Sequence, residues 1–79
     1  MKKVFLKRNE INEILIRKNK SQNWFAHKLE VSTGYMSQLM DGSRNPSPKL
    51  RERIMSIFPN CEFDDLFVIE EPSTVESEN

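Results

Sequence analysis

The sequence contains little cysteine and no long apolar run, and each shortage excludes a class of protein. Cys61 is the only cysteine, so no internal disulfide can form and a reduced, cytoplasmic setting is expected. His27 is the only histidine, so the chain lacks the ligand cluster of a structural zinc site. No apolar run approaches the roughly 18 residues that cross a bilayer, and residues 4–6 are too short for the apolar segment of a signal peptide. We therefore expect no metal, no cofactor and no membrane partner.

Charge is distributed unevenly along the 79 residues, although the formal net charge is zero. All 12 lysines and arginines lie in residues 1–53 together with five acids, so this part carries a net charge of +7. Residues 54–79 contain seven acids and no base. Charged surfaces are common in soluble proteins, but a basic body followed by an acidic end also suggests a polyanionic partner such as nucleic acid.

The length allows one domain. We expect it to span residues 1–69, followed by an acidic, disordered tail over residues 70–79, which are rich in glutamate and small polar residues. The apolar segments at residues 3–6 and 67–69 could pair as a two-stranded ribbon, which is marginal without support from helices.

Residue spacing predicts an all-α domain of four to five short helices. A first helix is expected over residues 9–18, with Asn9 as its N-cap and one apolar face. Another helix begins at Ser47-Pro48, because serine suits the N-cap and proline suits the first helical position. Residues 63–67 could form a final short helical turn.

The most informative pattern is a pair of capped helices with only about three residues between them. Ser21 is the expected N-cap of the first, which ends near Leu29, and Ser32 is the expected N-cap of the second, which ends near Met40. Gly42 can then take the left-handed conformation that ends a helix. Helices joined this tightly cross steeply, and such a unit can lay its second helix in the major groove of DNA. The residues expected to face inward are Phe25, Ala26, Leu29, Met36, Leu39 and Met40.

This segment resembles the Cro/C1-type (XRE) helix-turn-helix family of phage and bacterial repressors. The resemblance covers about residues 9–58 and includes Ser21-Gln22, Phe25-Ala26, Leu29-Glu30-Val31-Ser32, Met36-Ser37-Gln38-Leu39-Met40-Asp41-Gly42 and Asn45-Pro46-Ser47. It implies a small lambda-repressor-like bundle that binds double-stranded DNA and regulates transcription, with repression the expected outcome.

Two positions depart from the family pattern. Glu30 stands where the turn usually carries glycine, so we expect it to adopt a less comfortable backbone conformation. Gly34 lies inside the recognition helix, where glycine costs about 1 kcal/mol relative to alanine, and it removes a side chain that could have contacted a base.

The resemblance places base contacts on the exposed start of the helix that follows Ser32. Gln38 can form two hydrogen bonds with adenine, and the methyl group of Thr33 can contact the methyl group of thymine. The residues expected to contact bases are Thr33, Gly34, Tyr35, Ser37 and Gln38. The residues expected to contact the backbone or to position the helices are Gln22, Lys28, Ser32, Arg44, Asn45 and Lys49.

Other interpretations stay open for some of these features. Tyr35 also fits a core aromatic, and Trp24 fits packing on the first or fourth helix better than a phosphate contact. An enzyme is poorly supported, because the sequence offers no nucleophile–histidine pairing and no phosphate-binding glycine loop. The alternative is a protein-interaction module of the same fold, such as an antitoxin or adaptor whose acidic tail wraps its partner; the tail could instead shield the basic face.

The family resemblance also bears on assembly. We expect a homodimer on an inverted repeat, with recognition helices about 34 Å apart. No effector domain fits in this length, so we expect no small-molecule effector.

Overall fold

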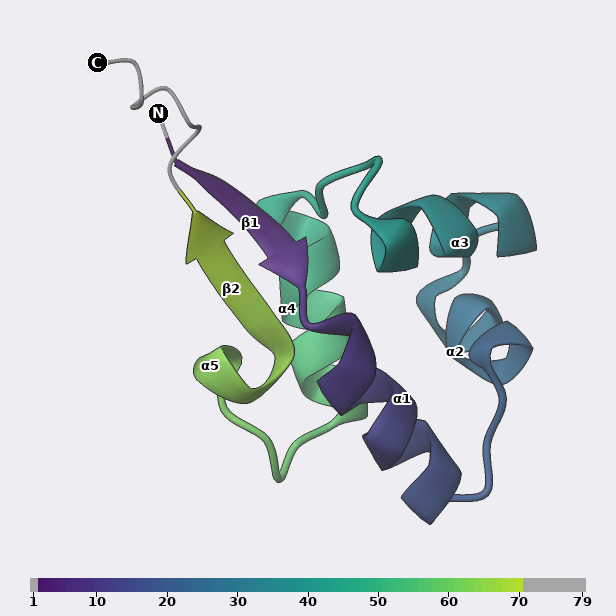
Figure 1. Ribbon diagram of the computed structural model, residues 1–79. Coiled ribbons are helices and arrows are strands. Elements are labelled where there is room, and N and C mark those ends of the chain that lie inside the picture. Colours follow the sequence, from purple (N-terminus) through teal and green to yellow (C-terminus); the bar gives the residue numbers. More distant parts are fainter. Residues whose placement is uncertain (1, 71–79) are drawn as a thin grey trace.

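Five helices and one short antiparallel sheet form residues 2–70, the part of the chain that the computed structural model describes (Figure 1). The elements follow in the order β1 (Lys3–Leu6), α1 (Arg8–Arg17), α2 (Gln22–Leu29), α3 (Thr33–Asp41), α4 (Pro48–Ile57), α5 (Phe63–Leu66) and β2 (Phe67–Glu70). The mostly helical class and the pairing of the two apolar segments confirm what the sequence predicts.

Side-chain caps set where three of the helices begin. Ser21, Ser32 and Ser47 each accept a hydrogen bond from the backbone N–H three residues further on, at 3.0, 3.0 and 3.2 Å. Pro48 occupies the first turn of α4, where its missing N–H has no helical partner to lose. Gly42 ends α3 with a φ of 87°, in the left-handed region. Residue types alone predict each of these boundaries, and each is confirmed.

The start of α1 differs from the prediction, since Asn9 is not its N-cap. The helix begins at Arg8, Lys7 occupies the cap position, and no side chain caps this end. The Lys7 amide donates to the Leu66 carbonyl at 2.8 Å, and the Lys7 carbonyl accepts from the Ile11 amide at 2.9 Å. A backbone contact with α5 therefore anchors this boundary, and a contact so distant in the chain leaves no local sequence signal.

The sheet extends one residue beyond the predicted end of the domain. Lys3 lies opposite Glu70 and Leu6 lies opposite Phe67 in an antiparallel pairing. Glu70 thus belongs to β2, and its assignment to a disordered tail is wrong. Its charge is opposite to that of Lys3 on the facing strand, an arrangement that favours pairing. The rest of the predicted tail, residues 71–79, lies outside the described residues.

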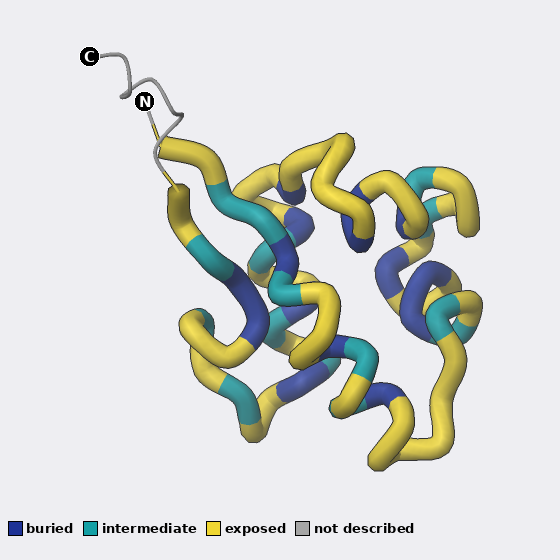
Figure 2. Tube along the Cα trace, in the orientation of Figure 1, coloured by how far each residue is buried: buried dark blue, intermediate teal, exposed yellow. Residues whose placement is uncertain are grey.

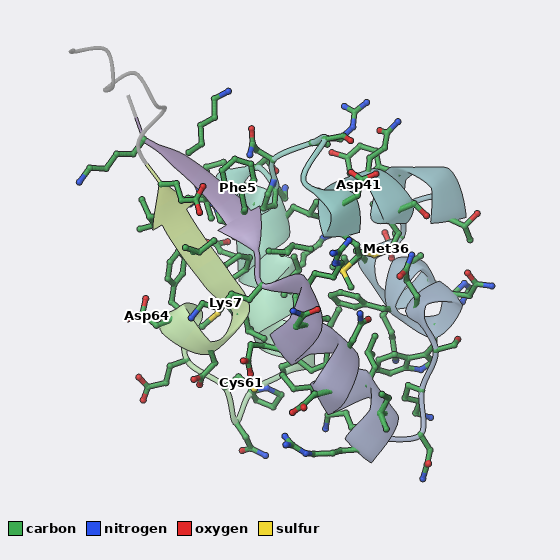
Figure 3. All side chains as sticks on the ribbon, in the orientation of Figure 1. Phe5, Lys7, Met36, Asp41, Cys61 and Asp64 are labelled. Carbon is green, nitrogen blue, oxygen red and sulfur yellow. The ribbon has the colours of Figure 1, made fainter. Side chains whose placement is uncertain are left out.

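The core is an apolar cluster to which every element contributes (Figure 2). Phe25 on α2 and Phe58 after α4 are both buried, with ring centroids 5.3 Å apart. Figure 3 shows Met36 on the inner side of α3. The residues of α2 and α3 that were expected to face inward are all buried, namely Phe25, Ala26, Leu29, Met36, Leu39 and Met40. The apolar side of α3 is therefore fixed in the core, which leaves its polar side facing solvent.

Candidate nucleic-acid interface

The connection between α2 and α3 is short and holds one residue in a costly conformation. Glu30 has φ 62° and ψ 40°, which lie in the left-handed region. Glycine usually occupies such a position, and the sequence predicts that Glu30 has to adopt a less comfortable backbone conformation in its place. Arg53 of α4 braces this turn, because its guanidinium donates to the Leu29 carbonyl at 3.0 Å and lies 3.4 Å from the Glu30 carboxylate. Sequence reasoning missed Arg53, whose partners lie 23 and 24 residues earlier. The turn thus fixes α3 relative to α2 and α4.

The solvent-facing side of α3 carries the side chains predicted to contact bases. Thr33, Gly34, Ser37 and Gln38 are exposed, and Tyr35 is half-buried. A Cβ atom added at Gly34 would meet no atom within 4 Å outside the helix's own backbone, so the surface is open at this position. The face therefore offers hydroxyl and amide groups that can both donate and accept hydrogen bonds.

One side-chain hydrogen bond joins this face to α2. The amide nitrogen of Gln22 donates to the Ser37 hydroxyl at 3.4 Å. Gln22, at the start of α2, was expected to contact DNA together with Ser37, and the structure brings the two residues together. The polar surface of α3 is therefore continuous with the first turn of α2.

Arg44, in the loop after α3, lies on the same face. Its Nε donates to Oε1 of Gln38 at 2.8 Å, and its backbone amide donates to the Gln38 carbonyl at 3.2 Å. Its guanidinium carbon lies 4.7 Å from the centroid of the Tyr35 ring, a cation–π arrangement. Sequence reasoning assigned Arg44 to the DNA backbone and gave no sign of this cluster, since it depends on how the loop folds back over α3.

Two other residues predicted to contact the DNA backbone, Asn45 and Lys28, interact with parts of the protein outside α3. The side-chain amide of Asn45 donates to the Val4 carbonyl at 3.0 Å, which ties the loop to β1. The Lys28 ammonium lies 5.8 Å from the Trp24 ring centroid, and the Lys20 ammonium lies 5.3 Å from it. Asn45 thus has a structural partner, and Lys28 belongs to a cluster around the half-buried Trp24.

The last predicted backbone contact, Lys49, lies near the α3 surface. Lys49 and Tyr35 both line an open hollow of about 220 Å³ between the α2–α3 turn and the start of α4. Lys49 is exposed and its helix is capped by Ser47. A cation at this border can reach an anion that lies beside α3.

A compact turn holds the loop in place at the end of α3. The Asp41 carboxylate accepts from the Ser43 hydroxyl at 2.6 Å and from the Ser43 backbone amide at 2.8 Å. These two bonds, the hydroxyl bond first, lower the pKa of Asp41 below its ordinary value because they stabilise the charged form. The loop that presents Arg44 is therefore ordered by local hydrogen bonds.

Cations follow α3 in the chain, the acids Glu30 and Asp41 lie at or near its two ends, and three further acids gather at α5. The cations Arg44, Lys49 and Arg53 lie in the loop after α3 and on α4. The acids Glu62, Asp64 and Asp65 lie on and beside α5, which sits on the side of the molecule away from α3 (Figure 1). Arg44 and Lys49 are exposed cations that an anionic partner lying beside α3 would meet.

Residues 2–70 contain neither a membrane-spanning helix nor a cluster of metal ligands. Within this range, no helix is both long and apolar enough to cross a bilayer. Over the same residues, no group of three or more histidine, cysteine, aspartate or glutamate side chains is arranged to hold a metal ion.

Comparisons with family models, curated proteins and solved structures found no match to this chain.

Proposed function

We propose that this protein is a sequence-specific DNA-binding regulator of transcription, acting as a repressor without catalytic chemistry. In this proposal α1 to α5 form a lambda-repressor-like bundle and α2–α3 is its helix-turn-helix. The protein works in the cytoplasm of a bacterium, or for a phage or mobile element, and binds an inverted repeat as a homodimer.

The polar face of α3 is the observation that carries this proposal. Its apolar side is buried and its ends are set by Ser32 and Gly42, so the exposed side chains project from a fixed support. A helix of this kind fits the major groove, where each base pair presents a distinct pattern of donors and acceptors. Gln38 offers both a donor and an acceptor, the combination that matches adenine.

The neighbouring groups suit the phosphate backbone. Backbone N–H groups at the starts of helices and exposed cations such as Lys49 are the usual partners of phosphate oxygens. Gln22, which bonds to Ser37, lies where α2 begins and can touch the backbone beside the groove. Phosphate contacts position the protein, and the α3 side chains supply the sequence preference.

Selection of bound sequences from a random duplex pool, repeated at several salt concentrations, tests the proposal. We expect an enriched palindromic motif and an affinity that falls steeply with salt, because bound cations release counterions from DNA. Salt-sensitive binding without an enriched motif would reduce the proposal to general DNA binding. Absence of binding at low salt would refute it.

One observation favours a second candidate, a protein-interaction module such as an antitoxin or adaptor. An open hollow of about 620 Å³ is lined by Trp24 and three lysines, with no contribution from α3. The lining residues are Lys18, Lys20, Trp24, Lys28, Ser56 and Ile57. An acidic protein segment could rest there, and this candidate gains support if the random pool yields no bound duplex.

A further inference from the structure

Arg44 is held against the α3 surface by three contacts. Its backbone amide and its Nε both donate to Gln38, and its guanidinium stacks on the ring of Tyr35. A free arginine side chain has about 2 kcal/mol of rotamer entropy to lose when it forms a defined contact. The contacts with Gln38 and Tyr35 restrict much of this freedom before any ligand arrives. Arg44 is thus preorganised in the loop after α3.

We propose that Arg44 contacts a guanine base directly, beside the base that Gln38 contacts, and is therefore a specificity-determining residue rather than a phosphate contact. This inference rests on the proposed DNA-binding function. It assigns a G·C pair next to an A·T pair in each half of the operator.

The position of the guanidinium argues for a base over a phosphate. Nε of Arg44 lies 2.8 Å from Oε1 of Gln38. If the Gln38 side chain forms hydrogen bonds with a base edge, the Arg44 guanidinium, which is hydrogen-bonded to Oε1 of Gln38, enters the groove to nearly the same depth. The major groove is about 12 Å wide, so a helix at its centre keeps this guanidinium nearer to the base edges than to the phosphates along the rims.

The hydrogen-bonding groups left over also fit guanine. Because Nε donates to Gln38, the two terminal nitrogens of Arg44 remain as a fork of parallel donors. Guanine presents the matching pair of acceptors, O6 and N7, in the major groove. Arg44 forms no ion pair within the described residues.

Gln38 keeps its own capacity to contact adenine. A carbonyl oxygen has two lone pairs, so Oε1 can accept from Arg44 and from the adenine amino group together, while the amide nitrogen donates to adenine N7. Gln38 and Arg44 therefore form a coupled pair that matches two neighbouring bases. The Tyr35 ring holds the guanidinium by stacking against it, and this interaction uses only the face of the ring and not the hydroxyl group.

The experiment compares full-length protein and variants on selected duplexes. After pool selection with the unmodified protein, the conserved guanine is replaced by 7-deazaguanine, which keeps base pairing and removes the N7 acceptor. We expect affinity to fall by less than the roughly 5- to 150-fold that loss of the whole two-bond contact would cause, because O6 remains as an acceptor. Arg44→Ala should lose its preference for G·C at this position and should be insensitive to 7-deazaguanine.

Matched variants separate the base contact from charge and from folding. Tyr35→Leu should weaken guanine preference, whereas Tyr35→Phe should keep it, because only the ring face is used. Arg17→Ala removes the same charge from an exposed arginine on α1 that pairs with Glu13, and should leave base preference unchanged. Thermal melting by circular dichroism checks that each variant is folded.

Two outcomes overturn the inference, and they are distinguishable. If the unmodified protein selects a motif but Arg44→Ala weakens all duplexes equally, Arg44 is a phosphate contact and only this inference fails. If the unmodified protein selects no motif, the inference fails together with the proposed function.

Discussion

Gln38 is the residue expected to contribute most to the choice of DNA sequence. It is exposed on α3, and its side chain also holds Arg44. Its amide therefore has two roles, one toward DNA and one toward a neighbouring side chain.

Gln38→Ala should reduce affinity for the selected site by about 1–3 kcal/mol and relax the preference at one A·T pair. Because the variant also removes the acceptor of Arg44 Nε, the preference at the adjacent G·C pair should weaken in part. Competition binding on duplexes changed at each position measures both effects. An unchanged base preference at every position would show that Gln38 only faces solvent.

Asp41 provides a residue-scale prediction on pH. Its pKa is lowered chiefly by the Ser43 hydroxyl, so its stabilising contribution is present above the unfolded pKa of about 3.9 and disappears as pH falls through the folded value. Ser43→Ala should raise the pKa of Asp41, as followed by NMR titration of its carboxyl group. Ser56→Ala, on the exposed side of α4, should leave that titration unchanged. If both variants titrate alike, the turn does not hold the carboxylate.

The turn between α2 and α3 is the feature of interest at the scale of elements. Glu30 lies in the left-handed region, which disfavours side chains with a Cβ atom. The Arg53–Glu30 ion pair offsets little of this cost, because the side chains are 46% and 74% exposed. The other bond of Arg53, to the Leu29 carbonyl, does not depend on the Glu30 side chain.

Glu30→Gly should therefore stabilise the fold by about 0.5–1 kcal/mol in urea unfolding, since glycine accepts this backbone conformation without the steric cost. Glu30→Ala is the matched control, because it removes the same ion pair and keeps the Cβ atom. We expect no gain for alanine. Equal stability of the two variants would mean that the left-handed backbone carries no cost here.

Elements with local signals could be predicted from the sequence. Ser21, Ser32 and Ser47 cap their helices through atoms only three residues away, so residue type and spacing were enough. Asn9 failed as a cap because a backbone bond between Lys7 and Leu66 anchors the start of α1. Such distant partners have no signature in a short window of sequence.

The same distinction applies to the candidate site. The exposure of Thr33, Ser37 and Gln38 follows from helical periodicity once the buried face of α3 is known. The stacking of Arg44 on Tyr35 depends on the path of a loop, and the bond of Asn45 to Val4 depends on the placement of β1. Sequence reasoning identified these residues as candidates and could not determine their partners.

At the scale of the whole molecule, one group of acids lies apart from the candidate DNA-binding face. Acids on and beside α5 lie away from α3, and cations lie in the loop and helix that follow it (Figure 1). A net charge near zero gives little overall attraction to DNA, so attraction depends on which side approaches. Keeping the acids of α5 away from the α3 face lowers the electrostatic repulsion that DNA would meet there.

Lys49 tests whether this side meets the phosphate backbone. It is exposed and lines the hollow beside Tyr35, at the border of the α3 surface. If it neutralises one phosphate, Lys49→Ala should weaken binding to all duplexes about equally and reduce the slope of log affinity against log salt by about one. Arg17→Ala, which removes the same charge from α1, should leave the slope unchanged. Equal slopes for Lys49→Ala and the unmodified protein would mean that Lys49 does not contact a phosphate. A cation whose removal leaves the salt dependence unchanged releases no counterion from DNA.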